Sequence, residues 1–134
     1  MDAALIRLVW RRAGDCCEYC RLSQEFERPP FQIDHIIARK HQGPSTADNL
    51  ALSCLHCNSF KGSDIATLAP RTRKLTPLFN PRRQVWSRHF RWEGANLAGR
   101  TPIGAATVVL LKINDPFRVI LREALIAEGV FPPE

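Results

Sequence analysis

Hydrophobic and polar positions at the start of the chain follow the period of an α-helix. Over residues 2–12 the apolar side chains fall on one side of the predicted helix, and arginines fall on the other. Gly14 is placed to end this helix, because glycine readily adopts the left-handed conformation that closes one. After a double proline, an apolar and β-branched run at residues 31–37 predicts a strand that carries Asp34 and His35 near its end.

The pattern is weaker through the middle of the chain. Gly43 begins a predicted turn or loop, and residues 58–65 are suited to begin a helix. Residues 68–81 are rich in proline and basic side chains without a clear period, so we expect a linker or wrapping segment there. Alternation returns at residues 84–93, where aromatic side chains share one face, and a turn at residues 94–96 completes a predicted hairpin.

Two helices with strong start signals are predicted in the last third of the chain. Thr101 and Pro102 supply an N-cap and a first helical residue, and apolar residues follow at helical spacing. Asp115 and Pro116 repeat the signal and open a second helix, for which Gly129 is the predicted stop.

Composition is that of a small globular protein with an excess of basic charge. The chain has 134 residues, 45% of them hydrophobic, and it can bury a modest core that would benefit from a bound metal. Its formal net charge of +6 and its pI near 9.5 lie in the range of proteins that bind polyanions. A mild basic excess also keeps proteins soluble, so charge alone does not choose between these explanations.

The sequence predicts a cytoplasmic protein without membrane association. No run approaches the ~18 apolar residues of a membrane span, and residues 1–12 are too short and too charged for the apolar part of a secretory signal. In the cytoplasm, paired cysteines favour metal binding over a disulfide.

Four of the five cysteines form two Cys-x-x-Cys pairs. Cys17 with Cys20, and Cys54 with Cys57, have the spacing that lets two sulfurs reach one tetrahedral ion at ~2.3 Å, so the four predict a closed structural zinc site. Reduced core thiols and a redox-active pair are the alternatives. Cys16 fits the pair geometry less well, and we expect it to be a small buried hydrophobic residue.

Polar residues lie between the two cysteine pairs and directly after them. Asp34 and His35 are adjacent, Asn49 follows in a run with leucine, and Asn58 comes directly after the second pair. With a glycine turn and Lys61, this order resembles the HNH endonuclease family, whose ββα-metal motif runs Asp-His, a Gly-rich turn, Asn-Leu, Cys-x-x-Cys-Asn and a nearby Lys. The resemblance covers about Cys17 to Asp64.

The resemblance implies a role for each polar residue. His35 would be the general base that deprotonates the attacking water, a task that suits imidazole because its pKa lies near working pH. Asp34 and Asn58 would hold one divalent cation through oxygen atoms, which favours Mg²⁺ or Mn²⁺. Asn49 would brace the loop that orients the histidine. Taken one at a time, these residues are also common as turn, cap or surface residues.

The adjacent positions of Asp34 and His35 impose a geometric condition. Neighbouring residues on a regular strand point to opposite faces of the sheet. The two side chains can therefore serve one phosphate only if the strand bends there or if the substrate lies across its end.

Basic residues supply candidate contacts to nucleic acid. Arg39 and Lys40 follow the predicted strand, and Arg82 and Arg83 belong to a group of arginines in the second half of the chain. Lys61 lies about one helical turn beyond the second cysteine pair, where a phosphate contact and a purely structural role are about equally expected.

Together these features predict an α+β fold with a ββα-metal core stapled by a four-cysteine zinc site. Residues 1–75 would form the nuclease core with an N-terminal helix, and residues 76–134 a hairpin and two helices packed on it. The predicted function is metal-dependent hydrolysis of DNA by a monomer or homodimer with little sequence specificity, because no dedicated recognition helix is evident. The alternative is a zinc-stapled module that binds nucleic acid without cutting it.

Overall fold

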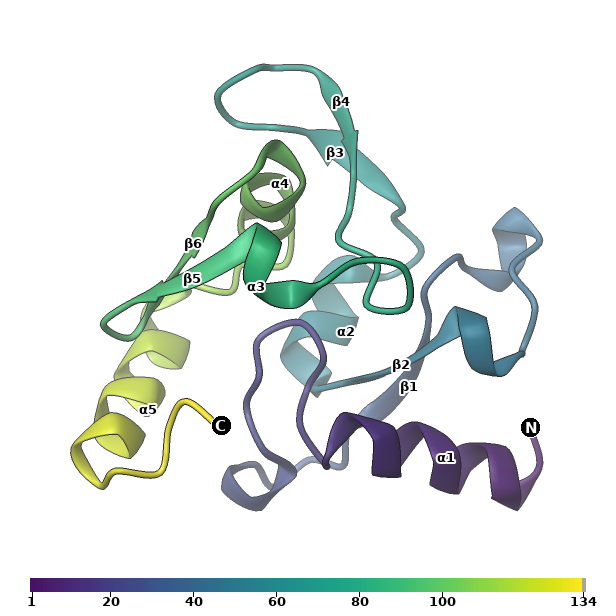
Figure 1. The fold of residues 1–134 in the computed structure, drawn as a ribbon, viewed down its shortest axis with the longest axis horizontal. Coiled ribbons are helices and arrows are strands. Elements are labelled where there is room, and N and C mark those ends of the chain that lie inside the picture. The colour runs from purple at the N-terminus through teal and green to yellow at the C-terminus, as the bar shows by residue number, and fades with distance from the viewer. Residues whose placement is uncertain (134) are drawn as a thin grey trace.

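A computed structural model describes residues 1–133 (Figure 1). In chain order the helices and strands are α1 (Ala3–Ala13), β1 (Gln32–His35), β2 (Leu50–Ser53), α2 (Leu55–Lys61), β3 (Ala66–Leu68), β4 (Leu75–Pro77), α3 (Trp86–His89), β5 (Phe90–Glu93), β6 (Asn96–Gly99), α4 (Pro102–Leu110) and α5 (Pro116–Ala127). Short 3-10 turns span Gln24–Phe26, Arg39–His41 and Ala47–Asn49. The strands pair as three antiparallel hairpins within the described residues: β1–β2, β3–β4 and β5–β6.

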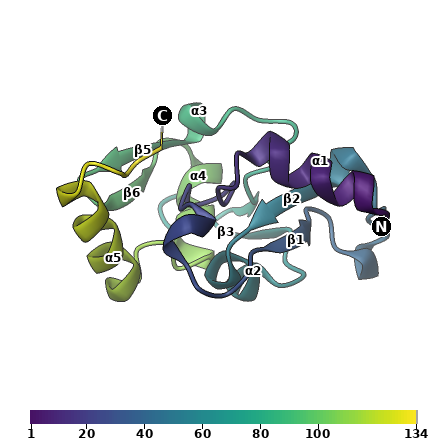
Figure 2. The same ribbon diagram turned by 90° about the horizontal axis from the view of Figure 1, so that it is seen from below.

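The β1–β2 hairpin and α2 form the ββα unit that the sequence predicts. Asp34 lies opposite Ala51 in the hairpin, and every residue of β2 is buried. Cys54 caps α2 through its sulfur, which accepts a hydrogen bond from the amide of Cys57 at 3.4 Å. In the view of Figure 2 the hairpin lies between α1 and α2, so both of its sides are covered by helix.

The N-terminal helix begins and ends close to where the sequence predicts. The carboxylate of Asp2 accepts a hydrogen bond from the amide of Leu5 at 2.8 Å, which satisfies one of the free amides of the first turn. Gly14 ends α1 with a φ of 61°, a left-handed conformation. Val9 is the fully buried residue of this helix, which packs against β2.

Both helices of the last third start at their predicted caps. The Thr101 hydroxyl accepts a hydrogen bond from the Gly104 amide at 3.1 Å, and the Asp115 carboxylate accepts one from the Phe117 amide at 3.0 Å. The hairpin before them is also confirmed, with β5 and β6 joined by a turn that contains Gly94 at a φ of 58°. The predicted hairpin and two helices are therefore present.

The strand predicted over residues 84–93 is wrong in its first half. Residues 86–89 form the short helix α3, and the strand begins only at Phe90. Trp86 and Phe90 are four positions apart, a spacing that places them on one face of a helix as well as of a strand. The aromatic cluster itself exists, since the ring centroid of Trp86 lies 5.1 Å from that of Phe90 and 5.9 Å from that of Trp92.

The segment predicted to lack regular structure contains one strand of a hairpin. Within residues 68–81 lies β4, which pairs with β3 (Ala66–Leu68), with Thr67 opposite Thr76. Strands of three residues are too short to show a period in the sequence. Proline lacks the amide hydrogen that a central strand position requires. Pro77 is therefore tolerated at the end of β4.

One buried apolar cluster includes residues of both halves of the chain. It contains Val9, Leu52, Phe79, Leu97 and Phe131, with no interruption between the ββα unit and the later elements. The boundary predicted between residues 75 and 76 falls inside β4. Among residues 1–133, no helix is long and apolar enough to cross a membrane.

Candidate active site

The four cysteines of the two Cys-x-x-Cys pairs meet in one buried cluster. Their sulfur atoms all lie within 4.8 Å of one another, and the sulfurs of Cys20 and Cys54 are 3.8 Å apart. Four sulfurs bound tetrahedrally at ~2.3 Å to one ion would be separated by ~3.8 Å. The cluster is therefore positioned to hold a metal ion, and its donor set fits zinc. Cys16 is half-buried and lies outside the cluster.

The thiols of the cluster shift one another's pKa values. Hydrogen bonds from Cys17 and the other two thiols lower the pKa of Cys20, while contact with Cys17 and Cys20 raises the pKa of Cys54 and of Cys57. Four neighbouring thiols thus do not ionise together unless a cation is bound. A guanidinium nitrogen of Arg118 lies 3.6 Å from the sulfur of Cys54, where its positive charge favours the thiolate form.

Asp34 is buried and receives a hydrogen bond on each carboxylate oxygen. The hydroxyl of Tyr19 donates to Oδ2 at 2.7 Å, and the ammonium of Lys61 donates to Oδ1 at 3.1 Å. Only 3% of Asp34 is exposed. Burial raises the pKa of the Asp34 carboxyl, whereas Lys61 and Tyr19 oppose this rise by stabilising the ionised form. Burial likewise raises the pKa of Tyr19, which keeps its hydroxyl a proton donor.

The structure gives Lys61 a different place from the predicted phosphate contact. Its ammonium also donates to the backbone carbonyls of His35 at 3.2 Å and Ile36 at 3.1 Å. An ammonium has three donors, and all three have partners within the protein. The residue is only 1% exposed, so Lys61 has neither a free donor nor access to a phosphate.

His35 is the last residue of β1 and is half-buried. Its Nε2 atom lies 2.8 Å from the hydroxyl of Ser45, in the loop between β1 and β2. Desolvation and the charge of Arg39 lower the pKa of His35, which favours the neutral imidazole. Asp34 points inward and His35 points toward the loop, so the two side chains lie on opposite faces of β1, as in a regular strand. Because β1 ends at His35, both residues are at the end of the strand.

Asn49 ties the loop after His35 to the start of β2. Its side chain accepts a hydrogen bond from the amide of Ile37 at 2.9 Å, and it donates to the carbonyls of Ile37 at 3.0 Å and Pro44 at 2.9 Å. Gly43 permits this closure, because a Cβ atom at that position would lie 1.7 Å from the carbonyl oxygen of Ile37. Asn49 thereby fixes both ends of the loop that carries Ser45.

Asn58 lies on the same face of α2 as Lys61, three positions earlier. It is half-buried, and its side-chain amide makes no hydrogen bond within residues 1–133. The carboxylate of Asp34 has one donor on each oxygen and so retains further lone pairs. One carboxylate and one amide oxygen are hard donors of the kind that Mg²⁺ and Mn²⁺ prefer.

The basic residues divide into exposed and engaged side chains. Arg39 and Lys40 are exposed in the turn after Ile37, and Arg83 is exposed beside a cavity of about 300 Å³ that Ile36 also lines. Arg82 departs from the predicted contact to nucleic acid, because its guanidinium pairs with Glu18 and its side chain is only 14% exposed.

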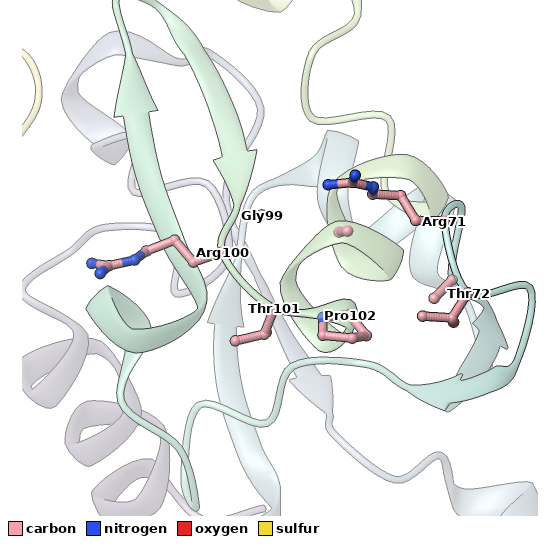
Figure 3. A pocket seen from close by; sticks show the side chains of 8 residues that line it. Arg71, Thr72, Gly99, Arg100, Thr101 and Pro102 are labelled. Carbon is pink, nitrogen blue, oxygen red and sulfur yellow. The ribbon is translucent and has the colours of Figure 1, made fainter.

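A second cavity, of about 280 Å³, lies apart from His35. Figure 3 shows it where the β3–β4 loop meets the end of β6 and the first turn of α4, with Arg71 on one side and Arg100 on the other. Its lining consists of Ala69, Arg71, Thr72, Gly99, Arg100, Thr101, Pro102 and Ala105. None of the predicted site residues is in this set.

Sequence patterns do not reveal two side chains of this site. Tyr19 lies inside the first Cys-x-x-Cys pair, and that position alone does not indicate that its hydroxyl reaches a carboxylate 15 residues away. Ser45 lies in a predicted turn, where serine is common for local reasons. Both contacts depend on how the loops pack across the hairpin.

Comparison with known protein families gives one match, in the first half of the chain. Residues 17–64 match the family model described as HNH endonuclease. This span contains all four cysteines of the cluster, and it agrees with the range over which the motif is visible in the sequence. No curated protein and no solved structure matches the chain.

The Asp34–Lys61 pair yields a stability prediction. Lys61→Met leaves a buried carboxylate without its counter-charge, and Asp34→Asn leaves a buried ammonium without one. Each single variant should lose about 3–5 kcal/mol of unfolding free energy, measured by urea denaturation of metal-loaded protein. The double variant removes both charges and should lose clearly less than the sum of the two. Strictly additive losses would show that the two side chains do not interact.

Proposed function

From the HNH endonuclease domain that residues 17–64 form, we propose that this protein is a metal-dependent endonuclease that hydrolyses DNA phosphodiester bonds. The observation that carries this proposal is the position of His35 at the end of β1, directly after the buried Asp34, with α2, which contains Asn58, packed against the strand. In this proposal the four-cysteine cluster holds zinc and has a structural role.

His35 takes the proton of the attacking water in this proposal. A general base must be unprotonated at working pH and must be held in a fixed orientation. The lowered pKa of His35 meets the first requirement, and the contact of Nε2 with Ser45 meets the second. Asn49 contributes indirectly, because it fixes the loop that presents Ser45. Water and scissile phosphate would approach across the strand end.

Asp34 and Asn58 would hold Mg²⁺ or Mn²⁺ through their oxygen atoms. When bound, the cation supplies positive charge that stabilises the transferring phosphoryl group and the leaving oxygen. Asp34 contributes a carboxylate to the ligand set, and the ammonium of Lys61 offsets part of its negative charge. The amide of Asn58 adds an oxygen without adding charge.

Exposed basic side chains would contact the DNA backbone. Arg39 and Lys40 lie in the turn that follows the catalytic strand, and Arg83 lies beside the cavity next to Ile36. Contacts of this kind are made to phosphates and carry no base information, which agrees with cleavage of little sequence specificity. The net charge of +6 favours association with any DNA segment.

The catalytic proposal is tested with His35→Ala. The variant should nick supercoiled plasmid about 10²–10⁴-fold more slowly than the wild type in Mg²⁺ or Mn²⁺, because it lacks the general base. The measurement is a time course of nicked product at equal zinc content. His41→Ala is the matched control, since His41 is exposed and lies in the same loop, and it should nick at the wild-type rate.

Two outcomes would contradict the assignment. If His35→Ala nicks as fast as the wild type, His35 is not the base. If the wild type retards DNA in a gel but does not nick it in either cation, the chain is a zinc-stapled nucleic-acid-binding module, which is the alternative function.

The two adjacent arginines should separate DNA binding from stability. Arg83→Ala should weaken DNA binding and lower the slope of log affinity against log salt by about 1, because one phosphate contact is lost. Arg82→Ala should leave that slope unchanged and instead lower the midpoint of thermal unfolding, because Glu18 loses its partner. Fluorescence anisotropy at several salt concentrations measures the first effect.

Arg91→Ala is the control for the removal of one charge, because Arg91 is exposed and pairs with Glu93. Equal slopes for Arg83→Ala and Arg91→Ala would contradict a phosphate contact by Arg83.

A further inference from the structure

Each half of the four-cysteine cluster sends one side chain to the same carboxylate. Tyr19 lies between Cys17 and Cys20, and its hydroxyl donates to Oδ2 of Asp34. Lys61 lies at the end of the helix that Cys54 caps, and its ammonium donates to Oδ1. The cluster and the candidate active site are therefore linked through two separate side chains that approach Asp34 from different elements.

The position of Tyr19 leaves its hydroxyl one partner. The residue is fully buried, and its hydroxyl makes a hydrogen bond to Asp34 alone within the described residues. Its backbone is held as well, because the indole nitrogen of Trp86 donates to the Tyr19 carbonyl at 2.9 Å. A phenylalanine would fill the same space in the core. The contact that the hydroxyl adds beyond this packing is the hydrogen bond to the Asp34 carboxylate.

Lys61 holds the carboxylate and the backbone of the catalytic strand at once. One of its three hydrogen bonds reaches Asp34, and the other two reach the carbonyls of His35 and Ile36. Rotation of the Asp34 side chain would break the contact with Lys61 on one oxygen and the contact with Tyr19 on the other. Two donors on two oxygens therefore fix both torsion angles of the carboxylate.

We propose that Tyr19 is a positioning residue that, with Lys61 on the other oxygen, holds the Asp34 carboxylate in the orientation in which it binds the catalytic cation. This inference rests on the proposed function, because it requires Asp34 to be a cation ligand. Groups that orient a metal ligand typically contribute 10–100-fold to metal affinity, whereas a tyrosine that only fills the core contributes nothing to it. Cation affinity therefore distinguishes positioning from packing.

The test measures binding of Mn²⁺ alone to the zinc-loaded protein, by the electron paramagnetic resonance signal of free Mn²⁺. Tyr19→Phe should raise the dissociation constant about 10-fold or more while the zinc content stays at the wild-type value. Thr107→Val is the matched control, because it also removes a fully buried, hydrogen-bonded hydroxyl but lies in α4. It should bind Mn²⁺ as the wild type does. Asp34→Asn, which removes the ligand charge, identifies the site by abolishing this binding while the zinc content stays at the wild-type value.

A second measurement needs no substitution at Tyr19. Tyr19 is the single tyrosine of the chain, so incorporation of 3-fluorotyrosine gives one ¹⁹F resonance that reports on its hydroxyl environment. Addition of Mg²⁺ should shift this resonance in the otherwise unaltered protein and leave it unchanged in Asp34→Asn. This readout applies even if Tyr19→Phe fails to fold.

The outcomes separate failure of this inference from failure of the proposed function. If the wild type nicks plasmid and binds Mn²⁺ through Asp34, but Tyr19→Phe binds Mn²⁺ equally well and the ¹⁹F resonance does not move, Tyr19 has no positioning role. If Asp34→Asn binds Mn²⁺ as the wild type does, Asp34 is not the cation ligand, and this inference and this part of the proposed function fail together.

Discussion

The arrangement of the ββα unit depends on the hydrogen bonds and the ion pair made by the buried carboxylate of Asp34. An ionised carboxylate without a partner is costly in a protein interior, and removing one member of a buried ion pair costs several kcal/mol. Lys61 supplies the opposite charge and Tyr19 a second hydrogen bond. To do so, α2 must pack against β1, and the loop after α1 must pass beside the hairpin. One side chain thereby sets the relative positions of three segments of the chain.

Metal binding at the four-cysteine cluster would help to stabilise this arrangement in a small protein. The loops that contain Cys17 and Cys20 have little regular structure, and ordering them costs conformational entropy that a modest core offsets only in part. A metal bound by both cysteine pairs contributes its binding free energy to folding. The same two pairs flank the elements that reach Asp34. The side chains that bond to Asp34 therefore belong to the same two segments as the cysteine pairs.

Local sequence signals were sufficient where the determining partners are close along the chain. The cysteine pairs, the caps of α4 and α5, and the glycine that ends α1 all depend on residues within one or two turns, and each was predictable. The apolar, β-branched run at residues 31–37 also predicted a strand with Asp34 and His35 near its end. The short hairpin β3–β4 and the helix α3 were not predictable, because strands of three residues and a helix of four show no distinct period.

The roles of charged residues are not predictable where their partners are far along the chain. Lys61 and Arg82 are residue types that are common on protein surfaces. In the structure, Lys61 pairs with Asp34, 27 positions away, and Arg82 pairs with Glu18, 64 positions away. No periodicity encodes such a pairing, since it follows from how α2 and the segment after β4 pack on the hairpin.

The central claim is that the cation and His35 share one site at the end of β1. It is tested most directly by recording the imidazole resonances of the four histidines while Mn²⁺ is added below one equivalent to zinc-loaded protein, because Mn²⁺ broadens nearby nuclei. The account predicts that the His35 resonances broaden before those of His41, His56 and His89. If the His35 resonances broaden no earlier than the other three, the cation is not bound beside His35 and the account is contradicted.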